Sequence, residues 1–168
     1  EEAALQLSNS TPVRYTQLFE YKRMKRVDCN RGTSGIDGAT STAVGASWVN
    51  EEMTIFITGD MGFLYDSNAL WSHYVTPKLK IVVMCHDGGG IFRFIQGPSE
   101  LPELEEFFET YRQVDVEGFA RLHGFSCWSV FDEQALQNVL PAFFAEKESA
   151  SILAIHTPRK VNHCILNG

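Results

Sequence analysis

Residues 53–60 read Met-Thr-Ile-Phe-Ile-Thr-Gly-Asp, and residues 79–90 read Leu-Lys-Ile-Val-Val-Met-Cys-His-Asp-Gly-Gly-Gly. Each stretch is a short, nearly continuous apolar run that ends in glycine and acidic residues. Such runs are typical of parallel strands that are buried on both faces of a sheet. The glycines that follow indicate that the chain turns out of the sheet at these points. The two stretches therefore predict central strands of a parallel sheet.

The rest of the chain alternates between short apolar segments and helix-like segments. We predict six strands, at residues 3–8, 26–29, 53–58, 79–85, 125–130 and 151–157. Helices are predicted at residues 12–20, 40–49, 68–74, 103–110, 116–123 and 133–145, the last with Asp132 as its N-cap. This alternation favours an α/β fold, a three-layer αβα sandwich with a mostly parallel six-stranded sheet. Residues 88–101 are rich in glycine and proline, as in loops that cover active sites.

Composition limits the class of protein. The chain has 168 residues, of which 44% are hydrophobic, so we expect a single domain over residues 1–168. The formal net charge of −7 argues against a nucleic-acid partner. No apolar stretch approaches the roughly 18 residues that span a bilayer, and no secretory pattern is present. The four cysteines, Cys29, Cys85, Cys127 and Cys164, lack short paired spacing, so we expect buried thiols in a cytoplasmic protein.

The ends of the two central strands carry residues that suit a bound anion. Gly59 and Asp60 end one strand, and a glycine-rich turn follows the other. Ligands of open α/β sheets bind beyond the carboxyl ends of strands, where backbone amides favour a group such as a diphosphate. A carboxylate beside a diphosphate requires a divalent cation between the two. Taken alone, these residues suit ordinary strand-end turns equally well, because glycine and aspartate are common in turns.

Four short blocks of sequence give the chain a specific resemblance. Residues 30–38 read Asn-Arg-Gly-Thr-Ser-Gly-Ile-Asp-Gly, and residues 8–14 read Ser-Asn-Ser-Thr-Pro-Val-Arg. Residues 59–66 read Gly-Asp-Met-Gly-Phe-Leu-Tyr-Asp, and residues 88–92 read Gly-Gly-Gly-Ile-Phe. In this order and spacing, the blocks resemble those of the 2-succinyl-5-enolpyruvyl-6-hydroxy-3-cyclohexene-1-carboxylate synthase family, the thiamine-diphosphate enzymes of menaquinone biosynthesis. The resemblance covers residues 5–92 by motif and extends more loosely to residue 159.

The resemblance implies a transferase reaction with thiamine diphosphate and Mg²⁺ as cofactors. Enzymes of this family decarboxylate 2-oxoglutarate and add the resulting succinyl carbanion to isochorismate in a conjugate addition. By position in the motifs, the expected cofactor-binding residues are Gly35, Ile36, Gly59, Asp60, Met61, Gly62 and Gly88. Among them, Ile36 would support the bent cofactor, and the carbonyl of Gly35 would accept a hydrogen bond from its amine. Asp60 and the carbonyl of Gly88 would bind the metal.

The same resemblance implies a set of substrate-binding residues. Ser10, Arg14 and Arg31 match positions that hold the carboxylates of the acceptor, a role that suits the planar fork of guanidinium. Ile91 and Phe92 match apolar positions near the reacting centre.

The chain departs from the family where an asparagine pair normally precedes the glycines. Here Cys85 and His86 stand in its place, and the second asparagine normally gives an oxygen to Mg²⁺. The expected metal-binding set is therefore Asp60, His86 and Gly88. Imidazole suits Mn²⁺ and other transition metals better than Mg²⁺, so we expect an altered metal preference. Gly62 also replaces a usual serine.

One part of the family's active site has no counterpart in this sequence. The glutamate that activates the cofactor belongs to a separate pyrimidine-binding domain, usually of a partner subunit, so no catalytic residue is expected in this chain. We expect the chain to be the C-terminal fragment of a longer homo-oligomeric protein and to be inactive alone. Two alternatives stay open, namely another thiamine-diphosphate lyase of the acetolactate-synthase type, and a non-catalytic binding module that kept the fold.

Overall fold

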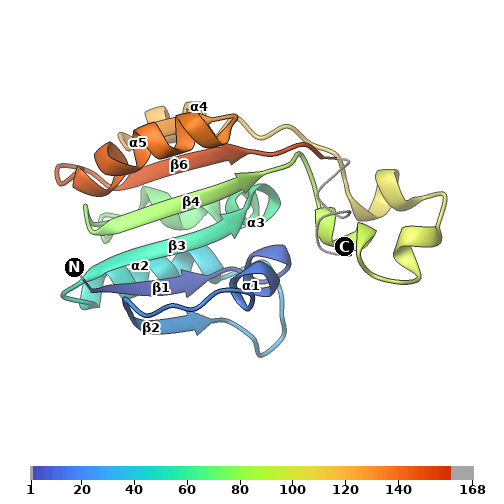
Figure 1. Cartoon of the computed structure of the whole chain (residues 1–168), viewed down its shortest axis with the longest axis horizontal. Helices are drawn as coiled ribbons and strands as arrows, with labels where there is room; N and C mark the ends of the chain where they lie inside the picture. Colours follow the sequence, from blue (N-terminus) through green and yellow to red (C-terminus); the bar gives the residue numbers. More distant parts are fainter. Residues whose placement is uncertain (1, 160–168) are drawn as a thin grey trace.

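Six parallel strands form the centre of the structure, a computed structural model that describes residues 2–159. They are β1 (Ala3–Leu7), β2 (Met24–Cys29), β3 (Met53–Gly59), β4 (Leu79–Cys85), β5 (Ser126–Val130) and β6 (Ser151–His156). Their order across the sheet is β2-β1-β3-β4-β6-β5, and each neighbouring pair is parallel. The carboxyl ends of the strands therefore lie at one edge of the sheet (Figure 1). The six predicted strands are confirmed, and the sheet is wholly rather than mostly parallel.

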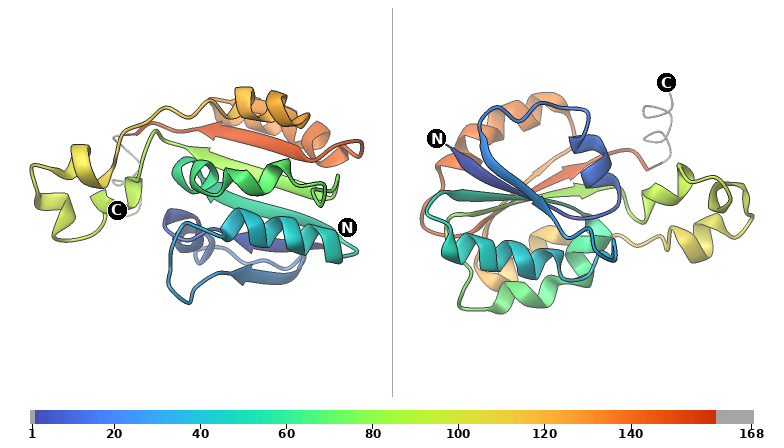
Figure 2. Two further views of the ribbon diagram at one scale, coloured as in Figure 1. Left: turned by 180° about the vertical axis from the view of Figure 1, so that it is seen from behind. Right: turned by 90° about the horizontal axis from the view of Figure 1, so that it is seen from below.

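Helices cover both faces of this sheet, which confirms the predicted αβα sandwich (Figure 2). One face carries α2 (Ala39–Val49), α3 (Asp60–Tyr65), the 3₁₀ turn η1 (Ser67–Trp71) and α4 (Val116–His123). The other face carries α1 (Thr11–Thr16) and α5 (Glu133–Ala145). The predicted N-cap of α5 is present, because Asp132 Oδ1 accepts a hydrogen bond from the amide of Ala135 at 2.7 Å.

The alternation of side chains along β4 explains why this strand is central. Ile81 and Val83 pack into the larger apolar cluster beneath α2 and α4, whereas Val82 packs into the smaller cluster beneath α5. Burial of each large apolar side chain contributes roughly 1.5–3 kcal/mol. A strand that serves both clusters cannot shift its register without exposing apolar surface on both faces.

Three predicted helices are shorter or of another type than the sequence suggests. The helix predicted at residues 12–20 ends at Thr16, and the one predicted at 68–74 is the short turn η1. The helix that follows β3 is α3, which lies before η1 in the chain and was not among the predicted helices. Residues 103–110 contain only one turn of π-helix, η4 (Leu104–Phe108). Leu104 is the only fully buried residue of that turn, which is too little apolar surface to fix a longer helix.

The segment between β4 and α4 leaves the sheet and forms a lobe beyond its carboxyl edge (Figure 1). This lobe, residues 86–115, contains η2 (Gly90–Arg93), η3 (Pro98–Glu100) and η4. The expected loop at residues 88–101 is thus built from short 3₁₀ turns, and it lies next to the strand ends.

The thiols differ in burial. Cys85 is buried as predicted, whereas Cys29 and Cys127 are only partly buried, and Cys164 lies outside the described residues. The prediction that Cys29 and Cys127 are buried is wrong. These two cysteines lie on the outermost strands of the sheet, β2 and β5, where side chains are less covered. All three described cysteines are free. None of the helices within residues 2–159 has the length and apolar character that crossing a membrane requires.

The N-terminus of α2 is capped by a residue from a different segment. Its own N-cap, Gly38, offers no side chain. Instead, the buried carboxylate of Asp66 accepts hydrogen bonds from the amide of Ser41 at 2.7 Å and from its hydroxyl at 2.9 Å. This contact ties the end of α3 to the start of α2, and it gives the last residue of the motif at 59–66 a structural role.

Replacing Asp66 is expected to destabilise the fold. Asp66→Ala leaves the amide of Ser41 without its acceptor, so the free energy of unfolding should fall by about 2 kcal/mol. Asp66→Asn keeps one oxygen acceptor and should lose less than half of that amount. Urea titration followed by circular dichroism measures both variants, and equal stability of Asp66→Ala and the parent protein would contradict this account.

Candidate functional site

A cavity of about 790 Å³ opens where β1, β2, β3 and β4 end. The chain passes from β1 to β2 on one side and then crosses to β3 on the other, so β1 and β3 flank a topological switch point. The cavity brings together every residue of the predicted site except Gly35. Its lining includes Ser10, Arg14, Arg31, Ile36, Gly59, Asp60, Met61, Gly62, His86, Gly88, Ile91 and Phe92.

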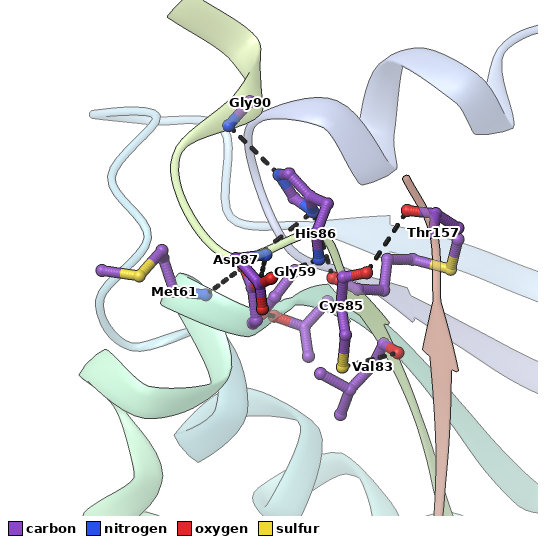
Figure 3. Close-up of polar contacts among 11 residues, drawn as sticks. Gly59, Met61, Val83, Cys85, His86, Asp87, Gly90 and Thr157 are labelled. Carbon is purple, nitrogen blue, oxygen red and sulfur yellow. Dashed lines mark hydrogen bonds and ion pairs between the residues drawn. The ribbon is translucent and has the colours of Figure 1, made fainter. Parts of the chain in front are cut away.

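Asp60 joins the ends of β3 and β4. Its side chain is 1% exposed. Oδ1 accepts a hydrogen bond from the amide of Met61 at 2.8 Å, and Oδ2 accepts from the amides of His86 and Asp87 at 3.0 and 2.7 Å. Figure 3 shows Met61, His86 and Asp87 converging from the two strand ends. The carboxylate charge is thus held by backbone dipoles, and it stands at the wall of the cavity.

His86 is braced against the turn that follows it (Figure 3). The amide of Gly90 donates to its Nε2 at 3.1 Å and also to the carbonyl of Gly88 at 3.0 Å. Nε2 therefore carries no hydrogen, and Nδ1, which does, lies 3.3 Å from the carbonyl of Met84 and 3.9 Å from Asp60 Oδ1. Nε2 of His86 and the carbonyl of Gly88, which belong to two residues of the predicted metal-binding set, thus accept the same amide hydrogen.

The thiol of Cys85 is buried beneath the cavity, unlike the imidazole of the neighbouring His86, which lines it. Burial, together with the carboxylates of Asp60 and Asp87, raises the pKa of this thiol to about 12. Its sulfur contacts the carbonyl of Val83 at 3.7 Å, and its own carbonyl accepts from the amide of Thr157 at 2.8 Å. A thiol that stays protonated at neutral pH is a poor nucleophile. Cys85 therefore serves as apolar packing beneath the site.

Asn9 organises the other half of the cavity, and the sequence did not mark it as a site residue. It is 1% exposed and lies in the turn after β1. Nδ2 donates to the carbonyls of Asn30 and Gly35, each at 2.6 Å. Oδ1 accepts from Arg31 Nη1 at 2.8 Å. One buried side chain therefore fixes both the loop at residues 30–38 and the direction of the arginine within it.

Gly62 explains one departure from the family pattern. A Cβ at this position would lie 2.9 Å from Thr58 Oγ1, 3.1 Å from Ser8 Oγ and 3.8 Å from the Cβ of Ile36. The first two approaches are tighter than ordinary contacts, so a serine would require the hydroxyls of Thr58 and Ser8 to shift. Glycine permits Ile36 to pack close to the start of α3.

Backbone strain is concentrated in the same turns. Ser10, Ser34 and Asp87 have positive φ angles of 76°, 58° and 62° although none is glycine. Each follows a strand that ends at the cavity, and such conformations persist where surrounding contacts over-determine them. Within residues 2–159, no cluster of three or more histidine, cysteine, aspartate or glutamate side chains suits a metal ion.

Removing the side-chain amide of Asn9 is expected to loosen the loop at residues 30–38. Asn9→Ala loses two hydrogen bonds to loop carbonyls, each worth about 1 kcal/mol, so amide exchange at residues 31–37 should accelerate by about tenfold or more. Hydrogen–deuterium exchange with mass spectrometry measures this rate. The exposed Asn68, changed to alanine, is the matched control, and an unchanged rate in Asn9→Ala would rule out the organising role.

Comparison with known proteins identifies the family. Residues 10–155 match the family described as "Thiamine pyrophosphate enzyme, C-terminal TPP binding domain". The chain is 49% identical to the 2-succinyl-5-enolpyruvyl-6-hydroxy-3-cyclohexene-1-carboxylate synthase of Porphyromonas gingivalis over 98% of its own length and 29% of the relative's. It is 41% identical to the synthase of the same name from Christiangramia forsetii, over 99% of this chain and 29% of the relative. The chain thus spans about three tenths of these relatives, and it belongs to the family of C-terminal TPP binding domains of thiamine pyrophosphate enzymes.

Proposed function

We propose that this chain is the cofactor-binding part of a 2-succinyl-5-enolpyruvyl-6-hydroxy-3-cyclohexene-1-carboxylate synthase. The proposed reaction is decarboxylation of 2-oxoglutarate followed by conjugate addition of the four-carbon succinyl unit to isochorismate, on the route to menaquinone. The observation that carries this proposal is the buried Asp60 carboxylate, which faces the cavity between two strand ends. The similarity to relatives that bear the synthase name supports the choice of substrates.

The residues at the strand ends fit a diphosphate with its metal ion. Asp60 supplies a hard carboxylate oxygen, and Oδ1 accepts only one amide hydrogen bond, so it can still bind a cation. Mg²⁺ usually takes one or two carboxylate ligands and completes its shell with phosphate oxygens and water. Gly59 leaves open space, since a Cβ there would meet only a His86 carbon at 3.9 Å. The site therefore admits both groups without rearranging the sheet.

Thiamine diphosphate, when bound, supplies an acidic carbon that adds to a 2-oxo acid and accepts the negative charge left as carbon dioxide departs. The chain's own residues position the reaction. Asp60 and the carbonyl of Gly88 would hold the cation, and Gly59, Met61 and Gly62 would line the diphosphate. Ile36 offers an apolar support, and the Gly35 carbonyl, already held by Asn9, is fixed for accepting a hydrogen bond.

Three polar side chains at the cavity wall suit a dicarboxylate or tricarboxylate acceptor. Arg31 is held by Asn9, whereas Arg14 is exposed on α1 and Ser10 stands at the start of that helix. Each guanidinium group can bind a carboxylate bidentately, and the hydroxyl can donate one further hydrogen bond, so together they fix the orientation of the acceptor. Ile91 and Phe92 lie in η2, in the part of the cavity wall that the lobe forms. Their apolar side chains would exclude water from the reacting carbon.

The proposal includes parts that this chain does not supply. A glutamate from a pyrimidine-binding domain, carried by the longer protein or by a second subunit, would activate the cofactor. The chain by itself is therefore expected to be inactive, and the working protein to be a homo-oligomer in the cytoplasm. Magnesium is the proposed metal, with Mn²⁺ or another divalent cation as the alternative that His86 favours.

Loss of the Asp60 carboxylate tests the function directly. In the full-length protein, Asp60→Asn should weaken metal-dependent binding of thiamine diphosphate by at least about a hundredfold, because a charged ligand to the cation is removed. Isothermal titration calorimetry with thiamine diphosphate and Mg²⁺ measures the affinity. Glu106→Gln, an exposed carboxylate on the lobe, is the control. Absence of any binding by the parent protein would instead support a non-catalytic module.

The metal preference can be tested at His86. If the imidazole binds the cation, His86→Asn should shift the ratio of Mn²⁺ to Mg²⁺ affinity towards Mg²⁺ by about tenfold, since an amide oxygen replaces a nitrogen ligand. The same titration, repeated with each metal, gives the ratio. Equal metal selectivity before and after the substitution would show that His86 only braces Gly90 through Nε2.

A further inference from the structure

The lobe at residues 86–115 contains a buried carboxylate that none of the proposed roles uses. Glu109 is 1% exposed. Its Oε2 accepts from Arg93 Nη2 at 2.8 Å and from Arg159 Nη2 at 2.7 Å, and its Oε1 pairs with Arg93 Nε. Arg93 also pairs with Glu105 at 2.9 Å. We call Arg93, Glu105, Glu109 and Arg159 the Glu109 clasp.

The clasp connects three segments that are distant in sequence. Arg93 ends η2, directly after the apolar residues of the cavity wall, and Arg159 lies just beyond β6. The guanidinium of Arg159 also stacks over the ring of Tyr111, 4.8 Å from its centre. Both arginines line the cavity, with side chains 17% and 19% exposed. The clasp therefore sits at the rim of the site and is anchored to the sheet through β6.

The backbone of Glu109 also touches the proposed metal-binding turn. Its carbonyl accepts from the amide of Gly89 at 2.8 Å, and the amide of Arg112 donates to the carbonyl of Asp87 at 3.3 Å. A Cβ on Gly88 would lie only 2.7 Å from the Glu109 carbonyl oxygen, and Gly88 has a φ of +148°. Only glycine permits this approach, so the two backbones are in direct contact at the residue whose carbonyl is proposed to bind the cation.

Strained backbone marks both sides of this contact. Asp87 has a φ of 62°, and Thr110, the residue after Glu109, has a φ of 46°. Non-glycine residues keep such angles only where neighbouring contacts hold them. The ion pairs of Glu109 and the hydrogen bonds to residues 87 and 89 are the contacts that hold them here.

We propose that Glu109 is a positioning residue for the metal-binding turn, acting through its backbone on Gly88 and Gly89 and through Arg93 on the apolar wall at residues 91–92. The inference deepens the proposed function and rests on it. Glu109 supports atoms that meet the cation and substrate but does not touch either one. Residues of this kind influence affinity because they fix the orientation of the direct ligands.

Glu105 provides a matched comparison within the clasp. It pairs with the same guanidinium, but its side chain is 54% exposed. Water screens that pair, whereas removal of the buried partner leaves two partly buried guanidinium groups without their shared counter-ion. A role in positioning therefore predicts a large effect at Glu109 and a small one at Glu105.

The test compares Glu109→Gln with Glu105→Gln in the full-length protein. Glu109→Gln should raise the dissociation constant of thiamine diphosphate with Mg²⁺ by about ten- to a hundredfold, whereas Glu105→Gln should stay within about twofold. The KM for Mg²⁺ should rise in Glu109→Gln, and Glu109→Asp should recover part of the affinity. Equal affinities in the two glutamine variants would overturn the proposal.

A second measurement separates this inference from the proposed function. Without any ligand, Glu109→Gln should accelerate amide exchange at residues 87–93, and Glu105→Gln should not. If the parent protein binds no cofactor, the proposed function fails, and the exchange rates alone decide whether Glu109 holds the turn. If Glu109→Gln does not fold, Arg159→Met, which leaves the Arg93 pair in place, should show a smaller change in the same direction, and no change in that variant overturns the proposal.

Discussion

The site depends on one buried carboxylate that accepts hydrogen bonds from two strand ends. Asp60 begins α3, and its oxygens bind the amides of Met61, His86 and Asp87, so the turns after β3 and β4 share one charge. Parallel strands make this possible, because their carboxyl ends meet at the same edge of the sheet. The apolar runs of β3 and β4 fix the register on both faces, and the register in turn fixes the distance between the turns. Packing far from the cavity thus sets its geometry.

Much of this arrangement is visible in the sequence. The continuous apolar runs at 53–58 and 79–85 gave the central strands, and the glycine and aspartate residues after them marked the edge where the cavity lies. The blocks at 8–14 and 30–38 placed Ser10, Arg14, Arg31 and Ile36 on that same edge, and the structure brings them together. Their roles in binding rest on the resemblance, since contact with a ligand is not part of what the fold displays.

Other features could not be read from local patterns. Asn9 stands between two serines in a turn, where asparagine is common, and only the three-dimensional contacts show that it joins the loop at residue 35 to Arg31. Glu109 follows several other glutamates, so composition cannot separate the buried one from the solvated ones. The helix predicted at residues 103–110 is wrong for a related reason, because that segment is held by ion pairs and a long-range backbone contact rather than by its own hydrophobic stripe.

The way the lobe is joined to the sheet also constrains how this protein can vary. Residues 94–103 extend away from the strand ends, and much of that stretch is solvated. Insertions, deletions or substitutions in this stretch would disturb few packed side chains. A change at the base of the lobe, by contrast, affects Gly88 directly, because the backbone of Gly88 packs against the carbonyl of Glu109 without room for a Cβ. Substitutions at the tip of the lobe should therefore be tolerated better than substitutions at its base, where Gly88 lies against the backbone of Glu109.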